Sequence, residues 1–201
     1  MLRLGLDPGR LGAGTVVRQD GDRWRVLKVH IWNYSWDEKN PKTHHEVLLP
    51  IYNEIKQFII EAMDLRDPED EAVVINIESP DEFAPSNIQS FSKLHQLIGA
   101  TKIAALEIAA KFSFVSVQGV APIKVKKAVL RAEDIRSDKY GLAGKMNKEK
   151  MVVRVRALGL WDNHFNWKKE VKPKARRNGK PVPNDLATTV SDAFSIAITG
   201  A

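Results

Sequence analysis

The chain of 201 residues contains no cysteine, which excludes disulfide bonds and metal sites built from thiolates. It has no apolar run near the ~18 residues that a membrane-spanning helix requires. It also shows no leader in which a positively charged segment precedes an apolar one. These absences favour a cytoplasmic protein with no membrane partner. Because 43% of the residues are hydrophobic, we expect one folded domain over residues 1–201.

Acidic side chains are scarce in the second half of the chain. Residues 1–110 hold 12 basic and 17 acidic side chains, whereas residues 111–201 hold 19 and 8. This asymmetry indicates a surface that binds a polyanion, expected to be nucleic acid, built largely from the second half. Many of the basic residues fall in a loop or arm at about 161–183. Its aromatic residues either stack on unpaired bases or anchor the loop to the core; they are Trp161, Phe165 and Trp167.

The spacing of apolar residues predicts a mixed α/β fold. Alternating or continuous apolar runs bounded by turn residues predict five strands, over residues 2–6, 12–17, 23–32, 72–77 and 112–117. Helical spacing and capping residues predict helices over 50–63, with Pro50 in its first turn, over 86–110, from 122, from 147 and over 185–199. This order implies a mixed five-stranded sheet, three antiparallel strands and then parallel strands, flanked by helices on both faces.

Carboxylates at the ends of predicted strands are the main chemical signal. Asp7 ends the first strand and Glu78 ends the fourth. If these strands are neighbours, both side chains emerge where open α/β sheets place their ligands. Asp192 lies in an otherwise apolar helix, and Asp185 lies seven residues earlier on the same face. Such oxygen donors suit Mg²⁺. The alternative, for any one of them, is an ordinary turn or cap residue.

Five segments resemble those of the RuvC-type Holliday junction resolvases, which have the RNase H-like fold. They occur in the same order and together cover nearly the whole chain. The segments are Leu4-Gly5-Leu6-Asp7-Pro8-Gly9, Val74-Ile75-Asn76-Ile77-Glu78, Ala121 to Val129, Asn147 to Val152, and Ser191 to Thr199.

The resemblance implies a structure-specific endonuclease that resolves four-way (Holliday) or branched DNA junctions as a homodimer, in a bacterium or a phage-infected cell. Hydrolysis of the phosphodiester would use two Mg²⁺ ions, with Mn²⁺ as a substitute. Asp7, Glu78 and Asp192 would be the catalytic metal ligands. Lys126, with Lys127 beside it, and Lys148 or Lys145 would contact the DNA backbone. Independently of the resemblance, the positive charge of the arm predicts DNA contacts by Lys174, Arg176 and Arg177, unless the arm is only a solvated basic loop.

The chain departs from the family pattern in two places. The family has a second acid three residues before the position of Asp192, where this chain has Thr189. Either Asp185 takes that role as a fourth ligand, or the site works with three acids. The aromatic residue that follows the family's second acid has its nearest counterpart in Phe83. Two alternatives therefore stay open: another RNase H-like nuclease, acting on RNA–DNA hybrids or RNA, and a non-catalytic junction-binding protein.

Overall fold

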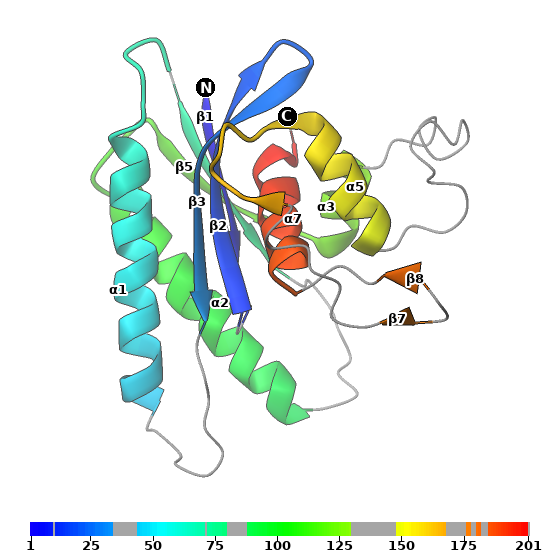
Figure 1. Cartoon of the computed structure of the whole chain (residues 1–201). Coiled ribbons are helices and arrows are strands. Elements are labelled where there is room, and N and C mark those ends of the chain that lie inside the picture. Colours follow the sequence, from blue (N-terminus) through cyan, green and yellow to red (C-terminus); the bar gives the residue numbers. More distant parts are fainter. Residues whose placement is uncertain are drawn as a thin grey trace.

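The protein forms one central six-stranded sheet with helices on both faces (Figure 1). The computed structural model describes residues 1–9, 11–33, 44–70, 72–79, 88–129, 148–167, 176–177, 180–181 and 185–200. The strand order is β5-β4-β1-β2-β3-β6. The mixed sheet with helices on both faces agrees with the prediction, but the sheet has six strands where five were expected.

The first three strands are antiparallel neighbours, as predicted. They are β1 (Leu2–Asp7), β2 (Leu11–Asp20) and β3 (Arg23–Asn33). The tight turn between β2 and β3 places Gly21 at a φ of 57°, in the left-handed region that glycine adopts without a steric cost. The strand β1 lies in the interior of the sheet, with β2 on one side and β4 (Val73–Glu78) on the other.

The two remaining strands, β5 and β6, lie at the two edges of the sheet. β5 (Val115–Val120) pairs in parallel with β4, and it begins three residues later than predicted because residues 111–114 form the turn after the preceding helix. The sixth strand, β6 (Gly159–Leu160), pairs in parallel with β3 at Trp24 and Arg25. A strand of two residues has no periodicity that a sequence pattern could reveal, which is why it was missed.

Two long helices, α1 (His44–Met63) and α2 (Ile88–Ala109), cover one face of the sheet. Their apolar stripes pack against the buried leucines of β1 and the isoleucines of β4. The start of α1 was predicted six residues too late, at Pro50, which lies inside the helix. The helix extends past the proline because Val47, one turn earlier, is buried in the same core.

Three helices cover the other face: α3 (Pro122–Val129), α5 (Lys148–Leu158) and α7 (Asp185–Ile198). Their apolar side chains form a second core with β2 and β3. Phe165 and Trp167 are buried in this core, and the Trp161 ring lies 5.3 Å from that of Phe194 in α7. These aromatic residues therefore anchor the segment after α5 to the core, the second of the two roles considered.

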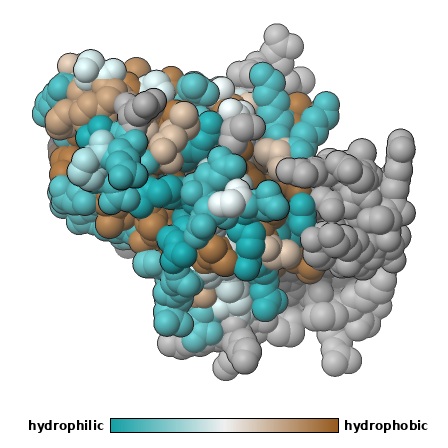
Figure 2. Space-filling model, turned by 90° about the horizontal axis from the view of Figure 1, so that it is seen from above, coloured by the Kyte–Doolittle hydropathy of each residue, from teal (hydrophilic) through white to brown (hydrophobic). Residues whose placement is uncertain are grey.

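The end of the sheet where β1 begins is polar. The carboxylate of Asp70, which is 3% exposed, accepts hydrogen bonds there from the Arg18 guanidinium, at 2.7 Å, and forms an ion pair with the Met1 ammonium. Figure 2, which looks down on the molecule from above, shows many hydrophilic residues on this side. No helix in the described ranges is long and apolar enough to cross a membrane.

Candidate active site

Asp7 and Glu78 end adjacent parallel strands. Leu6 of β1 lies opposite Ile77 of β4 in the parallel register, so each acid is one residue beyond this pair. Leu6 and Ile77 point into the core under α1 and α2. Because consecutive side chains of a strand point to opposite faces, Asp7 and Glu78 both face α7. The condition set by the sequence, that the two strands be neighbours, is met.

The helix α7 lies directly on β1 at this level. A methyl group on Gly5 would overlap the main-chain oxygen of Ala193 and the main-chain nitrogen of Ala197, so glycine allows this close approach. Asp192 precedes Ala193 in α7, and its side chain is half-buried. Asp192 is therefore carried on the helix that packs over the same face of the sheet as Asp7 and Glu78.

Side chains from β1 and β4 hold the carboxyl end of α7. Arg3 donates hydrogen bonds to the main-chain oxygens of Thr199, at 3.0 Å, and Gly200, at 3.2 Å. Asn76 donates from its amide to the main-chain oxygens of Ile196, at 2.9 Å, and Thr199, at 3.0 Å. These carbonyls lie at or just beyond the carboxyl end of α7, where the usual main-chain partners of a helix are missing or, as for the contact of the Thr199 N–H with Ile196, come from a tightened last turn. The strands that carry the acids thus also fix the helix that carries Asp192.

The polar side chain of Arg3 is unusually well covered for an arginine. It is 8% exposed, and this burial lowers the pKa of the guanidinium from its ordinary value. An arginine nevertheless stays protonated in proteins. Its positive charge beside the carboxyl end of α7 is favourable, because that end of a helix carries a partial negative charge.

The described residues do not form a complete metal site. They contain no group of three histidine, aspartate or glutamate side chains that could hold a metal ion. Asp7, Glu78 and Asp192 each take part in a polar or electrostatic interaction. The chemistry of the donors does fit Mg²⁺, since all three candidates are carboxylates and the chain has no cysteine. Their role as metal ligands stays a prediction.

The fourth candidate, Asp185, is the first residue of α7. Seven residues of helix separate it from Asp192, a rise of roughly 10 Å along the axis. Its side chain is outside the described residues. Thr189, one turn before Asp192, is 7% exposed and engaged in an interaction of its own. The helix geometry therefore makes Thr189, rather than Asp185, the nearer neighbour of Asp192.

The predicted basic residues fall into two groups. In α3, which packs against α7, the side chains of Lys124, Lys126 and Lys127 are all exposed. Arg176 and Arg177 form the short strand β7 (Arg176–Arg177), paired with β8 (Lys180–Pro181). Lys148 is the first residue of α5, but its side chain is outside the described residues, and so are Phe83, Lys145 and Lys174 altogether. Among the predicted basic residues whose side chains the structure describes, the α3 lysines lie on a helix that packs against α7.

A lysine that was not predicted lies at the same end of the sheet. The Lys102 ammonium, from α2, donates a hydrogen bond to the hydroxyl of Ser79 at 2.9 Å, and Ser79 directly follows Glu78. The sequence carries one signal for this residue: Lys102 is the single charged residue in the run of mostly small and apolar residues from Gly99 to Ala105.

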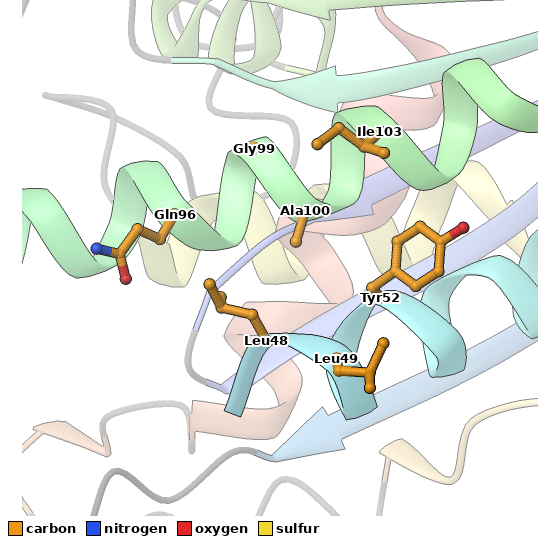
Figure 3. A pocket seen from close by; sticks show the side chains of 7 residues that line it. All are labelled: Leu48, Leu49, Tyr52, Gln96, Gly99, Ala100 and Ile103. Atoms are coloured by element: carbon orange, nitrogen blue, oxygen red, sulfur yellow. The ribbon is translucent and has the colours of Figure 1, made fainter. Parts of the chain in front are cut away.

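An apolar groove of about 460 Å³ separates α1 and α2 (Figure 3). Leu48, Leu49 and Tyr52 line it from α1, and Gly99, Ala100 and Ile103 line it from α2. Because the groove contains no acidic or basic side chain, it is not suited to hydrolysis of a phosphodiester.

The mixed sheet, with its strand order and helices on both faces, matches the RNase H-like fold. No family model and no curated protein sequence matches the chain. The structure of T. thermophilus RuvC in complex with a Holliday junction substrate is similar, with a TM-score of 0.57 and 20% identity over 99% of this chain and 92% of that chain. The yeast mitochondrial Holliday junction resolvase Ydc2 is similar with a TM-score of 0.51 and 10% identity, over 96% and 75%. The RuvC-type fold implied by the sequence resemblance is thus confirmed.

Proposed function

We propose that the protein is an endonuclease that resolves four-way DNA junctions by Mg²⁺-dependent hydrolysis of phosphodiester bonds. One observation carries the proposal: Asp7 and Glu78 end adjacent parallel strands and face the helix that carries Asp192. The similarity to two junction resolvases over nearly the whole chain supports this function over others that use the same fold.

The three carboxylates would hold the metal. Bound Mg²⁺ would supply the activated water and stabilise charge on the leaving oxygen. The protein's own residues then have two tasks. Asp7 and Glu78 keep their carboxylates at a fixed spacing, because the parallel register of β1 and β4 sets it. The helix of Asp192 is held against the same face of the sheet by its contacts with Gly5, Arg3 and Asn76.

The lysines of α3 would bind the DNA backbone. Lys126 and Lys127 are exposed, and α3 begins two residues after the carboxyl end of β5, the neighbour of β4. A DNA strand that crosses the carboxyl ends of β4 and β5 would therefore contact both the acids and the lysines. Exposed lysines hold phosphates mainly through charge, so binding should weaken as salt increases.

Symmetric cutting of a four-way junction requires two active sites, so we propose that the protein acts as a homodimer with a two-fold axis. The outer surface of α2 and the adjoining groove fit this role. Ile103 and Leu106 are each 55% exposed, and with Gly99 they share one face of the helix. A methyl group on Gly99 would meet no atom within 4 Å, so another helix has room to approach. Figure 3 shows the groove beside this face.

The dimer can be tested by placing a charge on that face. Ile103→Glu should give a monomer in sedimentation experiments at a concentration where the wild type is a dimer. Val153→Glu is the matched control, because Val153 is 44% exposed on α5, on the opposite face of the sheet. A wild-type protein that is a monomer at micromolar concentration would contradict the dimer.

The choice of substrate is tested by comparing cleavage of a four-way junction, a linear DNA duplex and an RNA–DNA hybrid, each with and without MgCl₂. We expect cleavage of the junction only, with magnesium, at symmetric positions on two strands. Preferred cleavage of the hybrid would support the alternative RNase H-like nuclease. Junction binding without cleavage under all conditions would support a non-catalytic binding protein.

A further inference from the structure

Lys102 has an environment that is unusual for a lysine. Its side chain is half-buried, and its ammonium donates a hydrogen bond to the Ser79 hydroxyl at 2.9 Å. Within the part of the chain that the structure describes, no carboxylate lies at ion-pair distance from this ammonium. By contrast, Lys28 and Lys56, which are also half-buried, are both paired with glutamates.

A half-buried ammonium without an anion is held at a cost, because burial removes part of its hydration. An ammonium has three hydrogen-bond donors, and Ser79 accepts only one of them. No described carboxylate neutralises this charge, so it can act on an external anion.

The position of Lys102 relates it to the candidate active site. Ser79 is the residue after Glu78, so the ammonium lies at the carboxyl end of β4. Ser79 faces α2, whereas Glu78 faces α7, because consecutive residues alternate between the two faces. Lys102 thus approaches the strand ends from the α2 face, and the α3 lysines approach them from the α7 face. The two sources of positive charge lie on opposite sides of the acids.

We propose that Lys102 binds a backbone phosphate of the DNA strand that is cut, on the α2 side of the sheet, and that Ser79 positions its ammonium. This inference rests on the proposed function and adds a second phosphate contact to it. With lysines on both faces, phosphates on either side of the scissile bond would be held while it lies over the carboxylates. The contact would fix the register of the strand across the ends of β4 and β5.

The decisive variant is Lys102→Gln, which keeps a hydrogen-bond donor for Ser79 but removes the charge. Lys102→Arg restores the charge. The control is Lys111→Gln, which removes the same charge just beyond the carboxyl end of α2, where Lys111 is exposed. Ser79→Ala keeps the charge but removes the hydroxyl. Binding of a four-way junction is measured without divalent metal over a range of salt concentrations, cleavage is measured with MgCl₂, and thermal unfolding is followed for each variant.

Loss of one phosphate contact should reduce the slope of log K against log salt by about 0.9 in Lys102→Gln. Junction binding at low salt should weaken roughly three- to tenfold, and Lys102→Arg should recover most of it. Lys111→Gln should match the wild type. Ser79→Ala should keep the wild-type slope but lower kcat, because the ammonium is present and less well positioned.

The inference is overturned if Lys102→Gln keeps the wild-type salt slope, whether or not its melting temperature falls. A lower melting temperature with an unchanged slope would make the Lys102–Ser79 contact purely structural. If the wild type itself neither binds nor cuts the junction, the proposed function fails instead, and that outcome is visible before any variant is made.

Discussion

The guanidinium of Arg3, in β1, donates a hydrogen bond of 3.0 Å to the main-chain oxygen of Thr199, just beyond the end of α7. This contact joins two parts of the chain that are 196 residues apart in sequence. Asn76 makes the equivalent contact from β4. The two strands that end in Asp7 and Glu78 thereby hold the helix of Asp192 at its far end. The three acids therefore depend on one set of contacts, and changes in these contacts should affect the site at a distance.

Replacing Asn76 is the first test of this arrangement. Asn76→Ala removes one donor from each of the carbonyls of Ile196 and Thr199, which keep the Thr199 N–H and the Arg3 guanidinium as donors. We therefore expect a loss of about 0.5–1.5 kcal/mol in the free energy of unfolding. Because α7 is held less firmly, cleavage should fall more than junction binding does. Urea unfolding and single-turnover cleavage measure the two effects. Asn53→Ala, at an exposed position on α1, is the control and should change neither. Equal losses of binding and cleavage would contradict this role.

Gly5→Ala tests the contact between β1 and α7. The new methyl group would overlap main-chain atoms of Ala193 and Ala197, and neither can move without shifting the helix. Overpacking of a core costs about 1–3 kcal/mol, and we expect the upper end because the obstacle is backbone. Thermal unfolding measures this loss. Gly119→Ala serves for comparison, since its methyl group would lie 3.5 Å from the side chain of Ser79, an ordinary contact. If both variants are equally stable, the close approach does not constrain α7.

The sequence predicted most of the sheet and the candidate acids, and the reasons are local. β1 and β4 have apolar runs that stop at Asp7 and Glu78, so both strand ends could be placed within a residue. Their adjacency was only a condition of the sequence argument, and the parallel pairing of β1 with β4 meets it. What could not be predicted depends on contacts between distant segments. The pairing of Gly159 with Trp24 in β6, and the hydrogen bonds of Asn76 to α7, leave no periodic signal in the chain.

Helix boundaries show the same limit. Pro50 favoured a helix start by its local preference, but burial of Val47 outweighed that preference. Lys102 was overlooked for a related reason, since a lysine in a helix is usually only a solvated side chain. Its significance depends on Ser79, which lies 23 residues earlier in sequence.

Stability at low pH should depend on Asp70. Burial raises the pKa of this carboxyl, but hydrogen bonds from the Met1 ammonium and Arg18 outweigh burial, so the net pKa is below its ordinary value. The stabilisation is fully present above the unfolded-state pKa of about 3.9 and is lost as the pH falls through the lower folded-state pKa. Asp70→Asn should therefore be less stable than the wild type at pH 7, and the difference should shrink on acidification.

Urea unfolding of the wild type and Asp70→Asn at neutral and acidic pH measures this difference. Asp64→Asn, at an exposed carboxylate for which no ion pair was found among the described residues, provides the baseline. A difference between wild type and Asp70→Asn that is the same at every pH would show that the carboxylate charge does not contribute.

Magnesium should stabilise the folded protein if the carboxylates bind it. A ligand at about one hundred times its Kd stabilises the native state by about 2.7 kcal/mol. We expect this stabilisation to be lost in Asp192→Asn and retained in Asp185→Asn, because Asp185 lies a further two turns away along α7. Unfolding in the presence and absence of MgCl₂ tests both. If Asp185→Asn also loses the magnesium effect, then Asp185 is a fourth ligand. If MgCl₂ stabilises Asp192→Asn as much as it stabilises the wild type, Asp192 is not a magnesium ligand.

The most direct test of the proposed function is magnesium-dependent cleavage of a four-way junction by wild type and Asp7→Asn. Asp22→Asn, in the exposed turn between β2 and β3, is the control for loss of one negative charge. The proposal predicts that wild type and Asp22→Asn cut two strands symmetrically, whereas Asp7→Asn binds the junction with undiminished affinity and does not cut it. Cleavage by Asp7→Asn at the wild-type rate, or cleavage by the wild type without a divalent metal, would contradict the proposed role of Asp7.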